Sequence, residues 1–371
     1  MVGLWIWSTI TIAMHQCNGL IYKRSKPPRC VNAAQKVATV IPSLNEVSNI
    51  GRCLQSLIDQ TFPAKNHQIY VVDGGSNDGT KAVVEEFIAK SSSAGPSIKL
   101  LENPNKYTPH ARNIALAEIP EDVEFIFEMI AHAYIPQDHI ETRVKDFLNI
   151  EEIQGRKIAG VGTLVRPDGS SRGMFARWVE STLLSPLGNS GGQFSQFKGR
   201  EKHHIPAFVI HRREALLSVD GWDERFHTNQ DSDLSMRLRK NNWQLWRSDV
   251  SHVEMSKRQN ISSFGKMCWR YGAWRMESLK IHPERGSIRE MLPAIGVLVT
   301  LLLVLFAPEF MFIPIIAYMI VIFVDGMRGA IVAKQPSLLL GLPLCLVILH
   351  TFFTLGFLSA SFRRPLDIAD R

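Results

Sequence analysis

One long stretch of the chain is almost free of charge. Residues 291–362 contain only four formally charged side chains in 72 residues, namely Glu309, Asp325, Arg328 and Lys334. A soluble hairpin rarely needs so long an uncharged stretch, whereas a membrane-spanning helix needs about 20 mostly apolar residues. The rest of the chain has an ordinary density of charge. The sequence therefore predicts a soluble-type body followed by a membrane-type tail.

Three apolar runs make up this tail. The runs at 291–307 and 310–324 are 17 and 15 residues long, which is short for a perpendicular span and leaves a kinked or re-entrant hairpin open. The third run, 338–362, is long enough to cross a bilayer. We therefore expect two to three transmembrane or re-entrant helices, a polar link at 325–337 and a polar tail at 363–371.

The positive charge of the chain gathers next to the first apolar run. The net charge is +7, of which residues 1–255 contribute +1 and residues 256–289 contribute +6. Basic and aromatic residues alternate at 264–275, a pattern typical of a helix at a membrane interface. We therefore expect a basic, aromatic juxtamembrane region at 256–290. The positive-inside rule predicts a body on the cytoplasmic side of the cell (inner) membrane. Nucleic acid is not expected as a partner, because the body has no basic stripe and no nucleic-acid motif.

The N-terminal segment, residues 1–35, is apolar at 1–14 and basic only afterwards. A secretory signal peptide has the reverse order, so this segment predicts a weak membrane anchor or upstream sequence before the true start. The five cysteines have no paired spacing, which favours reduced thiols over disulfides.

Short apolar runs alternate with helical patterns between residues 36 and 255. Four runs rich in β-branched and aromatic residues predict strands at 36–42, 68–72, 98–101 and 123–129. This alternation predicts an α/β fold with a mostly parallel sheet and helices on both faces. Ligands of such sheets bind beyond the carboxyl ends of the strands. Pro42, Asp73 and residues 128–132 are expected at these ends.

Two stretches resemble glycosyltransferase family 2. Its nucleotide-binding half is similar to VATVIPSLNEVSNIGRCLQSLIDQTFPAKNHQIYVVDGGSNDGT, and its acceptor-side motif is similar to GWDERFHTNQDSDLSMRLRKNNW. The resemblance covers roughly 36–282 and is greatest to bacterial exopolysaccharide glucosyltransferases of the succinoglycan type. It implies a GT-A (Rossmann-like) domain at 36–255, a nucleoside diphosphate sugar as donor with a UDP-sugar favoured, and a lipid-linked or polysaccharide acceptor.

The same resemblance implies residues that bind the nucleotide sugar. Pro42, Leu44 and Glu46 would line the base and ribose pocket, with Asp73 accepting hydrogen bonds; for Asp73 alone, capping of a tight turn is the alternative. Gly74 stands where many members have a second acidic residue, so one base contact is missing. Arg112 matches an arginine near the diphosphate, a role that suits the bidentate guanidinium group.

Two further arginines belong to this implied set. Arg270 and Arg275 lie in or beside an Arg-Tyr-Gly element, which in the resembled subgroup sits by the active site. They are expected to assist binding of the diphosphate or of a lipid phosphate.

The expected metal site departs from the family's pattern. Family members place Asp-x-Asp or Asp-Ala-His-Ala after the fourth strand to hold Mg²⁺ or Mn²⁺, whereas this chain has Ile130 at the first aspartate's position. An aliphatic side chain cannot ligate a metal. Either His132 holds the metal with Glu128 or His252, or the site has lost its metal, or catalysis is impaired.

Asp231 is the predicted general base. By resemblance it keeps the second acidic residue of the family's Glu-Asp pair, where Gln230 replaces the first. A carboxylate there would take the acceptor hydroxyl's proton in an inverting displacement. The same residue type also serves as an N-cap, here for a helix at 234–240, and both roles can hold together. The chain is thus predicted to be a membrane-associated inverting hexosyltransferase. A polyprenyl-phosphate sugar synthase and, because of Ile130, a noncatalytic nucleotide-binding member remain alternatives.

Overall fold

The computed structural model describes residues 35–91, 95–169, 173–189, 195–255 and 260–362. The predicted N-terminal anchor and the polar tail at 363–371 lie outside these residues. The described chain belongs to one compact unit, Val31–Arg371.

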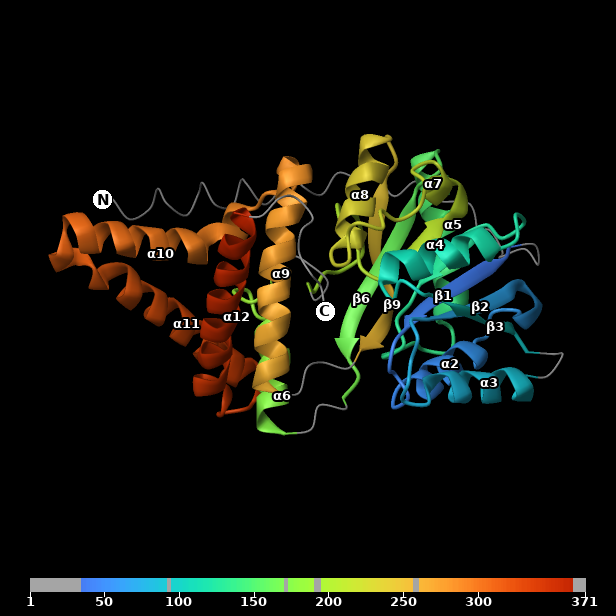
Figure 1. Cartoon of the computed structure of the whole chain (residues 1–371), viewed down its shortest axis with the longest axis horizontal. Helices are drawn as coiled ribbons and strands as arrows, with labels where there is room; N and C mark the ends of the chain where they lie inside the picture. Colours follow the sequence, from blue (N-terminus) through green and yellow to red (C-terminus); the bar gives the residue numbers. More distant parts are fainter. Residues whose placement is uncertain (1–34, 92–94, 170–172, 190–194, 256–259, 363–371) are drawn as a thin grey trace, which may run out of the picture. The chain divides into compact units, whose positions relative to one another are not determined.

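Four parallel strands form the first half of the sheet. They are β1 (Val37–Ser43), β2 (His67–Asp73), β3 (Ser97–Glu102) and β4 (Phe125–Glu128), in the order β3-β2-β1-β4. Figure 1 labels the first three of these strands. Each predicted strand is confirmed to within a few residues. Ser43 pairs in register with Asp73, so the loops after β1 and β2 leave the same edge of the sheet.

Helices cover both faces of this parallel part. Alternate β1 residues point to opposite faces: Val37 and Ile41 pack in a core with α2 (Ile50–Ile58), α3 (Thr80–Lys90) and α5 (His139–Gln154). Ala38 and Val40 pack in a second core with α4 (Thr108–Glu118), α7 (Arg213–Leu217) and α8 (Gln230–Lys240). Because both faces are buried, the strands are apolar throughout rather than alternating.

The second half of the sheet is mixed. Strand β8 (Ile210–Arg212) pairs antiparallel with both β4 and β6 (Gly160–Pro167), and β6 pairs in parallel with β9 (Leu245–Met255). Two short strands, β5 (Ala133–Tyr134) and β7 (Arg200–Lys202), pair with β9 and complete a nine-stranded sheet. The predicted α/β class is confirmed. The parallel strands β3, β2, β1 and β4 lie together at one end of the strand order.

Three long apolar helices end the described chain. They are α10 (Ile288–Phe306), α11 (Phe312–Ala333) and α12 (Leu338–Ser361), and each is long and apolar enough to cross a membrane. At about 1.5 Å per residue, even the shortest spans roughly 28 Å, close to the apolar thickness of a bilayer. The polar link predicted at 325–337 is too long, since α11 continues to Ala333. The helix tolerates Asp325 because that side chain is buried and pairs with Arg328 one turn later, at 3.7 Å.

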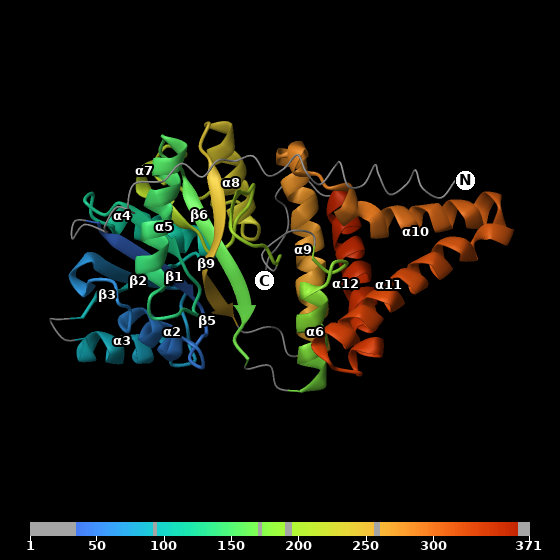
Figure 2. The ribbon, with the colours of Figure 1, turned by 180° about the vertical axis from the view of Figure 1, so that it is seen from behind.

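Helix α9 (Ile261–Ile281) packs lengthwise against α12, as both views show (Figures 1 and 2). The contact depends on two glycines: a Cβ atom at Gly272 would overlap the Phe353 carbonyl group, and one at Gly356 would overlap the Trp269 carbonyl group. Small residues permit such close approach of helix backbones. The basic, aromatic segment is therefore joined firmly to a candidate membrane helix.

Candidate active site

A cleft of about 1620 Å³ lies where the sheet edge meets the helical tail. One wall comes from the loops after β1 and β4 and from the start of α8. The other comes from α9, from the short turn η2 (Pro283–Arg285), and from α10 and α12. Small-ligand sites are typically about 300–1,000 Å³, so this cleft has room for a donor and an acceptor together. Of the predicted site residues, those lining it are Leu44, Glu46, Arg112, Glu128, His132, Asp231, Arg270 and Arg275.

The loops after β1 and β2 are bound to each other. The backbone N–H groups of Asn45 and Glu46 donate to the hydroxyl groups of Ser76 and Thr80, each at 2.8 Å. Asn45 has a positive φ of 55°, which asparagine tolerates better than most residues. This network holds Leu44 and Glu46 at the cleft.

Asp73 is buried beneath this loop. Its carboxylate accepts hydrogen bonds from the backbone of Gly75 and Ser76, both at 2.8 Å, and from the Ser76 hydroxyl group at 2.5 Å. Pro42 and Asp73 are not among the described residues that line the cleft. The structure thus gives Asp73 a loop-holding role, and direct contacts of Pro42 and Asp73 with a nucleoside stay predictions.

Glu128, at the end of β4, is the centre of a buried ionic cluster. Only 5% of it is exposed. Its Oε2 atom lies 3.4 Å from Arg112 Nη2, and its Oε1 atom lies 3.0 Å from Nε2 of the buried His211. Burial by itself would raise the pKa of Glu128, but the charges of Arg112 and His211 and the hydrogen bond from His211 outweigh it and lower the pKa. Glu128 is therefore an ionised internal partner of Arg112.

Asp231 is exposed in the cleft, in the first turn of α8. The helix begins at Gln230 with Asn229 at its N-cap position, so the predicted N-cap role of Asp231 for a helix at 234–240 is wrong. Although the carboxyl group opens to the cleft, the protein packed around it and the negative charge of Glu128 raise the pKa of Asp231. The positive charges of Arg112 and Arg275 act in the opposite direction. A raised pKa favours proton uptake, as a general base requires.

The residues expected to hold a metal do not form a ligand set. Both carboxylate oxygens of Glu128 are engaged as described, and the Ile130 side chain packs against the core. His132 Nδ1 lies 2.8 Å from Glu46 Oε1. His252 lies on β9, with Nε2 3.6 Å from Glu254, and is not among the described cleft-lining residues. Within the described ranges, no three His, Cys, Asp or Glu side chains group as metal ligands would.

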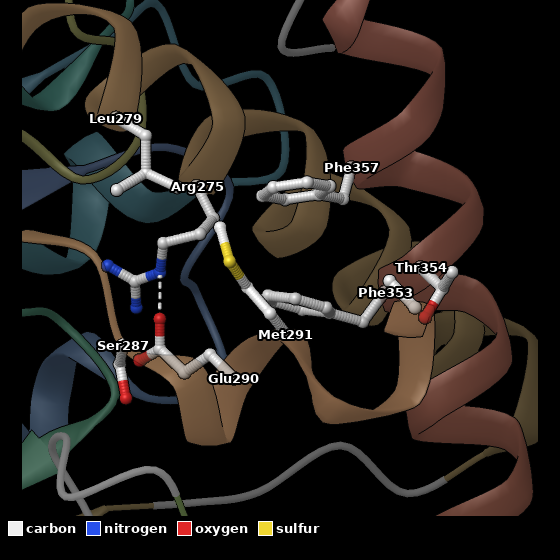
Figure 3. A pocket seen from close by; sticks show the side chains of 9 residues that line it. Arg275, Leu279, Ser287, Glu290, Met291, Phe353, Thr354 and Phe357 are labelled. Atoms are coloured by element: carbon white, nitrogen blue, oxygen red, sulfur yellow. Dashed lines mark ion pairs between the residues drawn. The ribbon is translucent and has the colours of Figure 1, made fainter. Parts of the chain in front are cut away.

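The helical wall of the cleft is basic. Arg270 and Arg275 project from α9, and Arg285 and Arg289 follow at η2 and α10. Arg275 Nε lies 2.8 Å from Glu290 Oε2, and Arg285 Nη1 lies 3.7 Å from Glu290 Oε1. Figure 3 shows the Arg275–Glu290 pair beside the aromatic side chains of α12. Glu290 thus orients two arginines of the cleft wall, at the start of α10.

Two hydrogen bonds one helical turn apart join α8 to α9. Asn229 Nδ2 lies 3.3 Å from Ser278 Oγ, and His282 Nε2 lies 2.8 Å from Asp233 Oδ1. Asp233 and His282 are both buried, and Arg237 Nε donates to the other oxygen of Asp233 at 2.7 Å. These contacts flank Asp231 and fix the helix start that carries it.

We expect His282→Ala to lower kcat about tenfold while the KM for the donor stays unchanged, because displacing Asp231, the predicted base, by even 1 Å can cost up to about 10² in rate. His282→Gln keeps an N–H donor for Asp233 and should restore most of the activity. Steady-state kinetics of the two variants measure this. Equal losses in both variants, or a loss confined to KM, would contradict a positioning role.

Sequence reasoning missed several of these residues. His211 follows an ordinary buried run, and His282 and Glu290 stand alone without a motif. None carries a local signal, because each is defined by a partner on another element of the fold. The Glu128–His211 pair, for example, joins residues 83 positions apart.

The strand order and the cleft at the strand ends, where the Asp231 carboxyl group faces a basic wall, are those of a GT-A-like fold. In agreement, residues 39–216 match the family model described as "Glycosyl transferase family 2". The chain contains a glycosyltransferase family 2 domain and is a glycosyltransferase.

Two relatives are similar in sequence, and one solved structure is similar in fold. The chain is 28% identical to "Succinoglycan biosynthesis protein ExoA" of Rhizobium meliloti over 68% of this chain and 73% of that protein. It is 26% identical to "Dolichyl N-acetyl-alpha-D-glucosaminyl phosphate 3-beta-D-2,3-diacetamido-2,3-dideoxy-beta-D-glucuronosyltransferase" of Methanococcus voltae, over 86% of this chain and 95% of that protein. The fold is similar to that of a mannosyltransferase from Pyrobaculum calidifontis, with a TM-score of 0.55, 15% identity and 91% of each chain covered.

Proposed function

We propose that this enzyme transfers a hexose, with inversion, from a nucleoside diphosphate sugar to a lipid-linked or polysaccharide acceptor at the inner membrane. A UDP-sugar is the favoured donor. The observation that carries the proposal is the shared cleft, in which Asp231 and the strand-end loops face arginines that lead into candidate membrane helices. The fold neighbour was solved with GDP-Man and Mn²⁺, which supports a nucleotide sugar as donor.

The proposed step is an in-line displacement. The acceptor hydroxyl oxygen forms a bond to the anomeric carbon, and its proton passes to the Asp231 carboxylate. The bond from the anomeric carbon to the β-phosphate oxygen breaks, and its electron pair leaves with the nucleoside diphosphate. Since attack and departure occur on opposite sides of the sugar, the configuration inverts.

The helical wall supports a membrane-bound acceptor. Its lining includes Pro293 of α10 together with Leu349, His350 and Phe353 of α12, from two candidate spans. A lipid tail could lie along these helices while its head group enters the cleft. The name of the Methanococcus voltae relative includes a dolichyl-linked sugar phosphate. The net charge of +6 in residues 256–289, next to α10, favours a catalytic domain on the cytoplasmic side.

A donor screen on the detergent-solubilised full chain tests the proposal. Several UDP- and GDP-hexoses are incubated with a polyprenyl-phosphate, a polyprenyl-diphosphate-linked sugar, or a soluble oligosaccharide, and nucleotide release and the product are analysed. We expect one donor to be consumed with a sugar-bearing acceptor and an inverted linkage. Transfer only to the bare polyprenyl-phosphate would identify a sugar synthase instead. Absence of transfer to every acceptor would contradict the proposal.

We expect transfer to fall on the acid side as pH drops through the raised pKa of Asp231, because the protonated carboxyl group cannot accept a proton. The inflection should lie above the ordinary aspartate value of 3.8. Glu128→Gln removes one cause of the shift and should move this acid limb to lower pH. Plots of kcat against pH for the wild type and for Glu128→Gln measure this fall and its shift. If the acid-side fall lies at the same pH in both proteins, Asp231 does not govern it.

A further inference from the structure

The residues expected to hold a metal are either aliphatic or already paired with other side chains in this chain. Ile130 occupies the position of the first aspartate and presents a partly buried aliphatic side chain to the cleft, packed against the core, while Glu128 is already engaged by two internal partners. His132 with Glu46 offers two side chains at most. The negative charge of a leaving diphosphate must therefore be met by other groups.

Two arginines on opposite walls of the cleft are suited to this. Arg112 comes from α4 and Arg275 from α9, both line the cleft, and the charges of both reach the Asp231 carboxyl group. In the in-line displacement described above, the base and the leaving diphosphate lie on opposite sides of the anomeric carbon, so both must fit within the same cleft. Arg112 and Arg275 line that cleft together with Asp231.

Both guanidinium groups keep unused donors. Arg112 is 5% exposed and pairs with Glu128 through Nη2, and in the described part of the chain its Nε and Nη1 atoms have no hydrogen-bond partner. Arg275 is held by Glu290, and its Nη1 atom likewise has no partner among the described residues. Buried donors are normally satisfied, so these N–H groups point to an anionic ligand. Each glutamate fixes one edge of an arginine and leaves other donors free.

We propose that Arg112 and Arg275 neutralise the leaving diphosphate directly, so that sugar transfer proceeds without a divalent metal. This inference rests on the proposed function. In the step described above, the electron pair of the broken bond adds one negative charge to the diphosphate. The guanidinium groups take up that charge by hydrogen bonds to the phosphate oxygens. Arginine suits this task because it stays charged when buried and matches two phosphate oxygens at once.

Nucleotide binding gives the first test, because it does not depend on turnover. Full-length protein in detergent, stripped of metals, is titrated with UDP and with GDP by calorimetry, once in EDTA and once in Mn²⁺. We expect the dissociation constant of the preferred nucleotide to agree within about twofold between the two conditions. Arg275→Gln should weaken binding roughly tenfold to a hundredfold, the range for hydrogen bonds to charged groups. Arg275→Lys should recover part of the loss.

The matched control is Lys266→Gln. Lys266 is exposed on the same helix and is not among the described residues that line the cleft, so its replacement should leave binding unchanged. Transfer by the wild-type chain should persist in EDTA, a measurement that no variant's folding can obscure.

Two results would overturn the inference. Binding or transfer that disappears in EDTA and returns with Mn²⁺ would show that a metal carries the diphosphate. Nucleotide binding in neither condition would refute the proposed function and this inference together. The first result would leave the proposed function intact, so the two failures are distinguishable.

Discussion

Asp231→Asn should reduce sugar transfer by about 10²- to 10⁴-fold, the usual contribution of a positioned general base. Asparagine has nearly the same shape but cannot accept the proton of the acceptor hydroxyl group. The carboxyl group lies exposed in the cleft at the start of α8, between the charges of Glu128, Arg112 and Arg275. We expect kcat to fall while the affinity for the nucleoside diphosphate changes by no more than about twofold.

Asp220→Asn makes the same chemical change at a site outside the cleft. Asp220 is exposed with a φ of 56°, which asparagine tolerates. Its replacement should leave both kcat and nucleotide affinity unchanged. Undiminished transfer by Asp231→Asn would refute the base assignment. A loss of nucleotide affinity equal to the loss of kcat would instead make Asp231 a binding residue.

Glu128→Ala should lower the free energy of unfolding by about 3–5 kcal/mol, because removing one member of a buried ion pair leaves the other charge uncompensated. Both Arg112 and His211 would lose their partner in a region where 5% or less of each residue is exposed. Glu128→Gln keeps the side-chain volume and an acceptor for His211, so it should cost less. Denaturation of the solubilised protein, followed by tryptophan fluorescence, measures the difference.

Glu214→Ala provides the control for this prediction. It breaks the Lys157–Glu214 pair, whose side chains are 59% and 57% exposed. Exposed pairs contribute roughly 0–1 kcal/mol, so this variant should remain close to the wild type. If Glu128→Ala proved as mild as Glu214→Ala, the cluster around Glu128 would not be the stabilising centre that its burial indicates.

Much of the fold could be predicted from local sequence patterns. The four parallel strands, the apolar tail and the position of Asp231 all follow from short stretches whose chemistry is visible in order along the chain. The extent of α11 was misjudged because Asp325 and Arg328 look polar in sequence, whereas a pair one turn apart can remain in a helix. Within the mixed half of the sheet, β5, β7 and β8 gave little signal, since they have only two or three residues each.

The sequence by itself determined the class of this protein. The strand-loop motifs and the carboxylate of Asp231 are local features, and the loss of metal-binding character at Ile130 is apparent from its side chain alone. Only the tertiary structure decided how the site balances its charges. His211 meets Glu128 and His282 meets Asp233 through packing of segments far apart in sequence, and Glu290 meets Arg275 through the fold of two consecutive helices. Coulomb attraction depends on distance in space, and burial determines its strength, so neither partner nor effect can be inferred from residue type alone.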